Sequence, residues 1–217
     1  MSAPTDRHEH HDHDHPHRHP PRADSDDRLG YYQLMEIAVR ELLTEKGIIT
    51  QEDVRRAIET MDARTPAHGA LIVARAWVDS AYKARLLRDA DTAIGEVGVA
   101  QGAYKLIVVE NTQHLHNLVV CTLCSCYPRF VLGLPPDWYK SRAYRSRAVR
   151  EPRAVLREFG TIVPDDVEVR VHDSTADMRY LVLPERPGGT SGMSEAALAE
   201  LVTRDSMIGV ARARDPA

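Results

Sequence analysis

The chain has 217 residues, 43% of them hydrophobic, and its 32 acidic and 28 basic side chains give a formal net charge of −4. This length suits one well-buried domain with an appendage, and the mildly acidic balance argues against a nucleic-acid partner. No apolar run approaches the length of a membrane span, and the N-terminus is polar where a secretory signal would be apolar. We therefore expect a cytoplasmic protein with no membrane association.

Residues 1–27 form a low-complexity tail rich in histidine. Because the tail has almost nothing to bury, we expect it to be disordered. It is either a solvated tail or purification tag, or a segment that captures divalent cobalt, nickel or zinc, which neutral imidazoles bind. The histidines are His8, His10, His11, His13, His15, His17 and His19.

The segment 28–97 is predicted to be a helical arm. Apolar side chains recur at helical spacing over residues 29–46, and Gly47 is placed to end that helix. Thr50 has the position of an N-cap for a second helix that ends near Met61. Two further helices are expected over residues 67–77 and 81–96.

The segment 98–217 has a different pattern and is predicted to be an α/β core. Short β-branched stretches at 105–110 and 118–120 indicate strands that lead to a group of cysteines. Alternating apolar residues predict two half-buried strands near 167–172 and 178–183, joined by a turn at 173–175. A late helix is expected from Ser194, its cap, to about residue 202. Helices followed by strands indicate an α+β fold.

All three cysteines of the protein lie within residues 121–127, Cys-Thr-Leu-Cys-Ser-Cys-Tyr, which we call the cysteine loop. If Cys124 and Cys126 bind one ion through sulfur, the peptide nitrogens of Ser125 and Cys126 are carried to the same ion. Small chelate rings then close around a planar set of two nitrogens and two sulfurs. Cys121 can approach along the axis, which leaves the opposite axial position open for chemistry.

This set of ligands limits the choice of metal. A peptide nitrogen binds only after it loses its proton, which requires a strongly polarising ion, and thiolates favour the softer transition metals. Structural zinc is a poor fit because it requires four side-chain ligands and there is no fourth cysteine. Trivalent cobalt or iron fits well.

Residues 120–128, Val-Cys-Thr-Leu-Cys-Ser-Cys-Tyr-Pro, resemble the metal-binding claw of the nitrile hydratase α subunit. Residues 132–140, Leu-Gly-Leu-Pro-Pro-Asp-Trp-Tyr-Lys, extend the match. Further similar stretches bring the resemblance to about residues 30–210; they lie at 144–147, 150–153, 183–187 and 201–210. The resemblance implies a layered α-β-β-α core and an N-terminal arm that wraps a partner subunit.

Carried over by position, the resemblance implies that Cys121 is the axial thiolate, that Cys124 becomes a sulfinic acid and that Cys126 becomes a sulfenic acid. Ser125 and Cys126 would lend backbone nitrogens. Thr122 is typical of the cobalt enzymes of this family, so the implied cofactor is low-spin Co(III), with Fe(III) as the alternative. The implied partners are a β subunit, or two smaller β-like subunits, whose arginines would hydrogen-bond the oxidised sulfurs, and an activator or cobalt chaperone.

The reaction implied by the resemblance is hydration of a small-molecule nitrile to the amide. The ion would act as a Lewis acid on the nitrile or on a water molecule. The sequence leaves open whether hydroxide or the Cys126 sulfenate attacks the nitrile carbon.

Two further residues are candidates for binding substrate. Gln101 resembles the family's pocket glutamine, although a loop glutamine beside a turn glycine is the ordinary alternative. Arg129 stands where nitrile hydratases usually have a tryptophan, and an arginine there favours an anionic or strongly hydrogen-bonding substrate. The γ subunit of thiocyanate hydrolase shares the cobalt claw and tends to have arginine here. A polar or bulky, nucleoside-like nitrile would fit both observations.

Other interpretations of the cysteine loop stay open at this point. A disulfide-exchange pair of Cys121 and Cys124 would leave Cys126 unexplained. Three buried structural cysteines, a metal-delivery protein that works through its histidine-rich tail, and a noncatalytic partner-binding subunit are the remaining alternatives. Tyr127 is expected to pack rather than to bind substrate.

Overall fold

The structure is a computed structural model that describes residues 29–216, so the tail expected at 1–27 lies outside the described residues. The chain divides into two compact units, one that ends at Gln51 and one from Glu52 to Ala217. The three-part division expected from the sequence stays a prediction. Within residues 29–216, no helix has both the length and the apolar character needed to cross a membrane.

The N-terminal helices form as predicted, but neither buries a side chain. α1 runs over Tyr31–Glu45 and ends just before Gly47, which has a positive φ of 66°. α2 runs over Gln51–Asp62. Tyr32 of α1 is 85% exposed, and other apolar side chains of this helix are exposed as well. The helical spacing therefore reflects an apolar face that nothing in the described residues covers.

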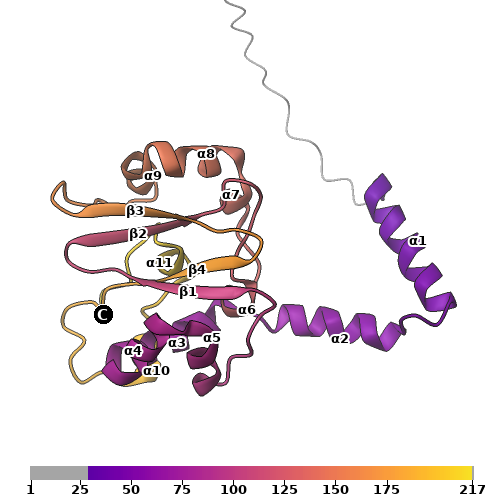
Figure 1. Cartoon of the computed structure of the whole chain (residues 1–217), viewed down its shortest axis with the longest axis horizontal. Helices are drawn as coiled ribbons and strands as arrows, with labels where there is room; N and C mark the ends of the chain where they lie inside the picture. Colours follow the sequence, from indigo (N-terminus) through magenta and orange to yellow (C-terminus); the bar gives the residue numbers. More distant parts are fainter. Residues whose placement is uncertain (1–28, 217) are drawn as a thin grey trace, which may run out of the picture. The chain divides into compact units, whose positions relative to one another are not determined.

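The second unit contains four strands in two parallel pairs (Figure 1). β1 (Lys105–Glu110) pairs with β4 (Met178–Leu183), and β2 (Leu115–Val120) pairs with β3 (Glu168–Asp173). β3 and β4 follow one another in the sequence, as predicted, but they do not pair with each other. The turn between them crosses from one sheet to the other, because each strand finds its partner in a different earlier strand.

Helices cover both sheets, which confirms the predicted α-β-β-α layering (Figure 1). α8 (Arg142–Arg150) and α9 (Pro152–Glu158) pack on β2 and β3, whereas α4 (Ser80–Arg88) and α5 (Ala90–Ala93) pack on β1. The predicted helix over 81–96 is divided into three, and at the first break the Asp89 side chain accepts a hydrogen bond from the hydroxyl of Thr92, three residues further on. The remaining elements are α3 (Pro66–Val78), η1 (Ile94–Val97), α6 (Arg129–Leu132), α7 (Asp137–Lys140), α10 (Glu195–Ala199) and α11 (Arg204–Ile208).

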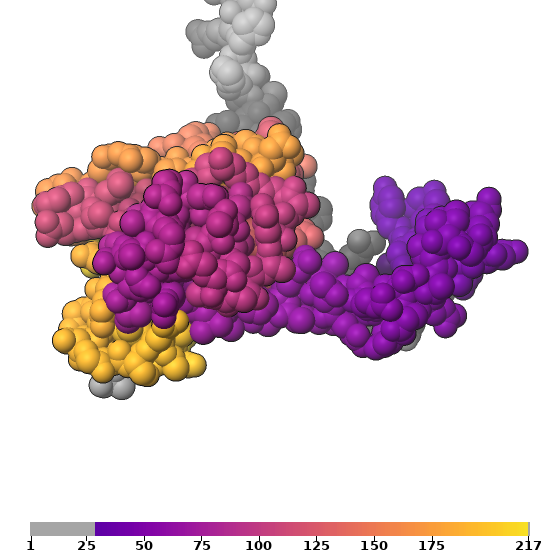
Figure 2. Space-filling view, turned by 60° about the horizontal axis from the view of Figure 1, so that its bottom comes forward, coloured from indigo at the N-terminus to yellow at the C-terminus, as the bar shows by residue number. Residues whose placement is uncertain are grey.

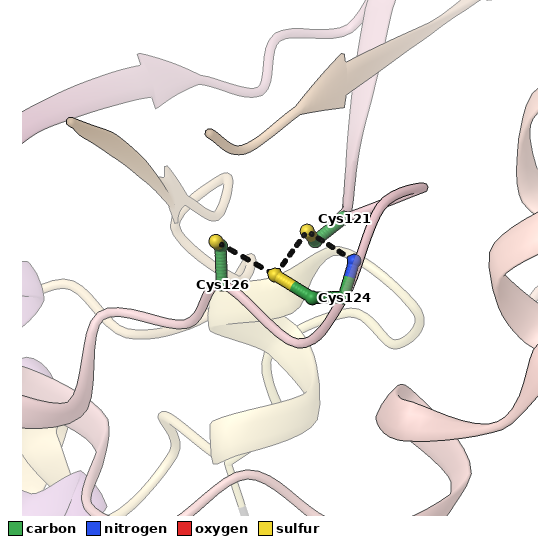
Figure 3. Close-up of side chains that lie close together, drawn as sticks. All are labelled: Cys121, Cys124 and Cys126. Carbon is green, nitrogen blue, oxygen red and sulfur yellow. Dashed lines mark hydrogen bonds between the residues drawn. The ribbon is translucent and has the colours of Figure 1, made fainter. Parts of the chain in front are cut away.

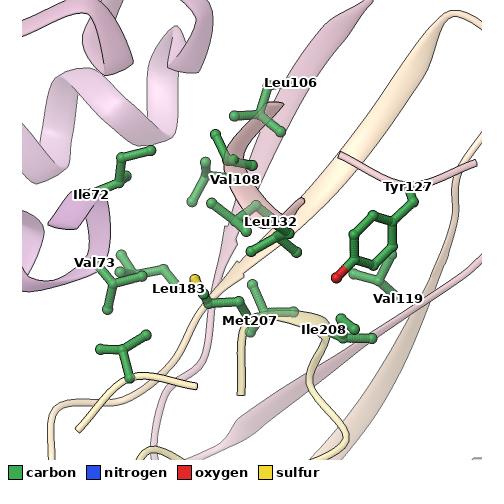
Figure 4. Close-up of a cluster of buried hydrophobic side chains, with 14 of the residues drawn as sticks. Ile72, Val73, Leu106, Val108, Val119, Tyr127, Leu132, Leu183, Met207 and Ile208 are labelled. Carbon is green, nitrogen blue, oxygen red and sulfur yellow. The ribbon is translucent and has the colours of Figure 1, made fainter. Parts of the chain in front are cut away.

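The hydrophobic core joins α3, the strands and α11 (Figure 4). Ile72 and Val73 of α3 and Met207 of α11 are buried in this cluster, and burial of each such side chain contributes about 1.5–3 kcal/mol. Gly209 ends α11 with a φ of 90°, and a Cβ there would lie 2.0 Å from the Asn117 carbonyl oxygen. The end of α11 therefore rests directly on the backbone of β2. On the outside of this unit, α10 in the C-terminal part of the chain packs against α3 (Figure 2).

The strand directions determine where the cysteine loop lies. The short connection at 111–114 reverses the chain between β1 and β2, where Thr112 and Leu115 form an antiparallel bridge. The C-terminal ends of β2 and β3 and the N-terminal ends of β1 and β4 therefore meet at one edge. Cys121 leaves β2 at this edge, beside the end of β3.

Candidate metal centre

The three cysteine sulfurs converge at this edge (Figure 3). The Sγ atoms of Cys121 and Cys124 are 3.6 Å apart, those of Cys124 and Cys126 are 3.2 Å apart, and all three lie within 4.8 Å of one another. Cys121 is fully buried and Cys126 is 9% exposed, whereas Cys124 is exposed. Cys121 and Cys126 thus form the buried part of the cluster, and Cys124 is its solvent-exposed member.

The pKa values of the Cys124 and Cys126 thiols are shifted in opposite directions. The pKa of Cys124 is lowered, first by the hydrogen bond with the Cys126 thiol, then by Cys121 and by the peptide N–H groups of Ser125 and Cys126. Burial raises the pKa of Cys126 to about 12, the other two cysteines add to this, and the charge of Arg179 opposes it. The exposed Cys124 thiol therefore loses its proton more readily than the Cys126 thiol.

Neighbouring side chains fix the shape of the loop. Asp173, at the end of β3, accepts hydrogen bonds from the Thr122 backbone N–H at 2.9 Å and from the Thr122 hydroxyl at 2.5 Å. The buried Tyr139 hydroxyl donates to the Cys126 carbonyl oxygen at 2.8 Å, and the Tyr144 hydroxyl donates to the Val119 carbonyl at 2.7 Å. One buried tyrosine therefore holds the cysteine loop at Cys126, and a second holds the strand that leads into the loop.

The donor atoms fit a single soft ion. Two sulfurs bound at right angles to one ion, each about 2.3 Å from it, would be about 3.3 Å apart, close to the 3.2 Å between Cys124 and Cys126. Within residues 29–216, no other group of three or more His, Cys, Asp or Glu side chains converges in this way. Among residues 29–216, no fourth side chain of these types joins the three cysteines to complete the tetrahedral set that structural zinc requires.

The two candidate substrate residues lie on the segments next to the cysteine loop. Arg129 begins α6; its backbone N–H donates to the Tyr104 hydroxyl at 2.9 Å, and its exposed side chain has no hydrogen-bond or ionic partner among the described residues. Gln101 is exposed. The adjacent Gly102 touches the Phe130 ring so closely that a Cβ would lie 2.3 Å from it, which brings the Gln101 backbone beside α6. The roles of both residues stay predictions.

The structure also brings in residues that the sequence did not single out. Asp173 was part of an expected turn, Tyr139 lay within a matched motif, and Tyr104 and Arg179 carried no signal of their own. Tyr104 donates to the Tyr127 carbonyl at 3.1 Å. The expectation that Tyr127 packs is confirmed, because its ring is buried against Tyr139 with centroids 5.1 Å apart. Asp173 ends β3 and Arg179 lies near the start of β4, so a search at the ends of the predicted strands could have found them.

Fold and site together define a class of protein in which a two-sheet α-β-β-α core presents three clustered cysteines at one sheet edge. Residues 30–211 match the family described as nitrile hydratase, alpha chain. The chain therefore belongs to the nitrile hydratase α-chain family, which confirms the resemblance drawn from the cysteine loop.

Individual relatives agree with this assignment. The chain is 54% identical to the low-molecular-weight cobalt-containing nitrile hydratase subunit alpha of Rhodococcus rhodochrous, over 80% of this chain and 84% of that one. It is 44% identical to the thiocyanate hydrolase subunit gamma of Thiobacillus thioparus, over 83% and 79%. A solved structure of a thiocyanate hydrolase mutant superposes with a TM-score of 0.82 and 42% identity, covering 88% of this chain and 93% of that one.

Proposed function

We propose that this protein is the α subunit of a cobalt-dependent nitrile hydratase, which adds water to a nitrile and yields the amide. The observation that carries the proposal is the convergence of three sulfurs within one loop, all within 4.8 Å of one another. A relative named as cobalt-containing supports the choice of metal. Fe(III) is the alternative.

The residues that would hold low-spin Co(III) are Cys121, Cys124 and Cys126 through sulfur, and Ser125 and Cys126 through their peptide nitrogens. When bound, the trivalent ion supplies a Lewis acid that activates a nitrile or a water molecule. We assign a sulfinic acid to Cys124 and a sulfenic acid to Cys126, with an oxygen-derived oxidant as the source of the added atoms. The exposure of Cys124 would give such an oxidant access to its sulfur.

Cys126, Gln101 and Arg129 would act on the substrate. Cys126 lies on the buried wall of the loop, where an oxidised sulfur would carry a nucleophilic oxygen. Arg129 offers a guanidinium that no described residue engages, so it is free to donate hydrogen bonds to a polar group of the substrate. Gln101, next to the Gly102 that packs on Phe130 of α6, would present an amide to the substrate. A polar or bulky nitrile, such as a nucleoside-like one, suits these two side chains better than a small apolar nitrile.

The chain would work with a nitrile hydratase β subunit, or with two smaller β-like subunits, and would receive cobalt through an activator or chaperone. The exposed apolar side chains of α1 support a partner that covers this helix. An oxidised cysteine loop carries anionic oxygens, and charge-assisted donors from a partner would satisfy them.

The test is cobalt content, intact mass and nitrile turnover of the purified complex, in the wild type and in two loop variants. Cys124→Ser is expected to lose cobalt, the added oxygens and turnover. Leu123→Ala is the matched control, because it changes an exposed neighbour that offers no ligand atom, and it is expected to keep all three. Wild-type complex without cobalt, iron or added oxygens would overturn the proposal. Cobalt without turnover, even with the partner present, would instead indicate a metal-delivery protein.

A second candidate activity is hydrolysis of thiocyanate to carbonyl sulfide and ammonia. Arg129 favours it because a guanidinium suits an anion, and a thiocyanate hydrolase gamma subunit is among the relatives. Turnover of thiocyanate and of neutral nitriles by the same preparation separates the two activities. Replacement Arg129→Trp is expected to lower the turnover of an anionic substrate far more than that of an apolar nitrile.

A further inference from the structure

A hollow next to the cysteine loop is lined mainly by arginines of α8. Its volume is about 470 Å³, and Thr122 of the cysteine loop is part of its wall. The other lining residues all belong to α8; they are Arg142, Arg145, Ser146, Val149 and Arg150. We call this surface the arginine hollow. It presents three cationic side chains, and none of the residues that line it is acidic.

The sequence of α8 explains why these side chains share one face. The helix reads Arg-Ala-Tyr-Arg-Ser-Arg-Ala-Val-Arg, with four arginines and no acidic residue. Tyr144 and Ala148, four positions apart, are its buried side chains and turn toward the core. Arg142, Arg145 and Arg150 follow one another by three and five positions, a spacing that returns to the same side of a helix. The charge of α8 is therefore concentrated beside the cysteine loop.

The fourth arginine of α8 shows what the other three lack. Arg147 lies outside the hollow and forms salt bridges with Glu151 and Glu158. Within residues 29–216, no acidic side chain forms a salt bridge with any of the three arginines of the hollow. This includes Asp173, which binds Thr122 instead. Like charges three or four positions apart destabilise a helix, so this face favours an anion that balances them.

The hydrogen bonds of these arginines leave donors free. Nη1 of Arg145 donates to the Thr122 carbonyl oxygen at 3.4 Å, and its Nε is buried without a hydrogen-bond partner among the described residues. Nε of Arg150 donates to the Ser146 carbonyl oxygen at 3.1 Å. A buried, charged donor without an acceptor is unfavourable. The hollow therefore has several guanidinium N–H groups available for an acceptor from outside the described residues.

Apolar side chains next to the arginines indicate the size of the ligand. Val149, which lines the hollow, is 45% exposed, and Leu123, which follows Thr122 in the cysteine loop, is 83% exposed. A peptide segment that carries both carboxylates and apolar side chains would cover them, whereas a small inorganic anion would not. Carboxylates match guanidinium groups because they accept two parallel hydrogen bonds from each. The net charge of −4 makes a nucleic acid the less suitable anion.

We propose that the arginine hollow is a docking surface for an acidic segment of a partner protein. Carboxylates of this segment pair with the three guanidinium groups, and its apolar side chains cover Val149 and Leu123. Because Thr122 lines the hollow, a segment docked there also contacts the cysteine loop. The inference requires no bound metal and no turnover, so it stands apart from the proposed hydration of a nitrile.

The test measures binding of a fluorescent octaglutamate peptide to the full chain by anisotropy, at low and at high salt. The triple variant Arg142→Gln, Arg145→Gln, Arg150→Gln removes the charge of the hollow. The matched control changes three exposed arginines outside the hollow that also form no salt bridge among the described residues; they are Arg157→Gln, Arg212→Gln and Arg214→Gln. Both triple variants change the net charge equally, and thermal unfolding checks that each is folded.

We expect the hollow variant to bind octaglutamate roughly tenfold more weakly than the wild type, since three surface ion pairs of ordinary strength together give a factor of this order. The control is expected to stay within about twofold of the wild type, because charges far from the peptide are screened by salt. If the triple variant unfolds early, the double variant Arg142→Gln, Arg150→Gln replaces it. This double variant keeps the contact of Arg145 with Thr122 and is expected to bind severalfold more weakly.

Three results would overturn the inference. Unchanged affinity in the folded hollow variant would show that the peptide does not use these arginines. An equal loss in the hollow variant and the control would show that binding follows net charge alone. Tighter binding of an octathymidylate than of octaglutamate, lost in the same variant, would assign the hollow to a nucleic acid. Each result leaves the proposed function untouched, because that proposal is tested by cobalt content, added oxygens and nitrile turnover.

Discussion

The hydrogen bond from Tyr139 to the carbonyl oxygen of Cys126 offers a direct test of how the cysteine loop is held. Both partners are buried, and the hydroxyl lies 2.8 Å from the oxygen. Tyr139→Phe removes the donor and leaves the ring in place, so the aromatic contacts with Tyr127 and Tyr144 are preserved. The carbonyl of a proposed metal ligand then loses its buried partner.

The size of the effect follows from this burial. A buried carbonyl without a partner costs about 1–3 kcal/mol of folding free energy. In a domain of this size, about 1 kcal/mol lowers the unfolding temperature by about 2–4 °C. About 1.4 kcal/mol is a tenfold change in an equilibrium constant. If the same 1–3 kcal/mol were lost from the cobalt-bound loop, its affinity for cobalt would fall roughly 5- to 150-fold.

Tyr144→Phe is the matched control. The Tyr144 hydroxyl is also buried and donates to a backbone carbonyl at 2.7 Å, but that carbonyl belongs to Val119 within β2. The assay combines thermal unfolding with cobalt release to a chelator. We expect both variants to unfold earlier and only Tyr139→Phe to release cobalt faster. Equal cobalt release from the two variants would show that the contact at Cys126 has no special effect on the metal.

Three further results are expected. Asp173→Ala removes two hydrogen bonds with Thr122 and should destabilise the folded loop by about 1–2 kcal/mol, after allowance for the exposure of Asp173. The cobalt content at limiting cobalt should therefore fall, and an unchanged content would contradict this prediction. Gly209→Ala places a Cβ 2.0 Å from a backbone oxygen and should prevent normal folding, whereas Gly160→Ala, with a positive φ but open space, should cost only about 1–2 kcal/mol in a denaturant titration. Burial lowers the pKa of His116, so as the pH falls the unfolded chain binds a proton at this residue before the folded chain does. The free energy of unfolding should therefore fall as the pH drops below about 6.5, and His116→Gln should reduce that fall.

Local sequence patterns predicted the elements more reliably than their pairing. The spacing of β-branched residues located β1 and β4 well, and Gly47 marked the end of α1. The pairing of β3 with β2 and of β4 with β1 depends on contacts between segments far apart in the chain, which periodicity does not encode. The break after Arg88 was missed because it depends on the Asp89 side chain, which competes with the helix.

The same distinction applies to the candidate site. The three cysteines could be grouped from the sequence because their spacing is local. Asp173 reaches the loop, and Arg179 reaches the Tyr104 ring beside it, only because β3 ends and β4 begins at the end of β2; neither residue has a neighbour in sequence that signals this position. The exposed apolar side chains of α1 show the converse limit, since helical spacing predicts a covered face without showing what covers it.

The partner of Thr122 lies 51 residues further along the chain, and this distance sets an order of events during protein synthesis. When Cys126 leaves the ribosome, the strands that carry Asp173 and Arg179 have not yet been made. An ion that reached the nascent chain would therefore encounter the three thiols before Asp173 is present to hold Thr122 and fix the shape of the loop. If the chain binds cobalt as proposed, the complete site forms only after β3 and β4 have emerged and docked, and a cobalt-handling factor would act on the folded chain.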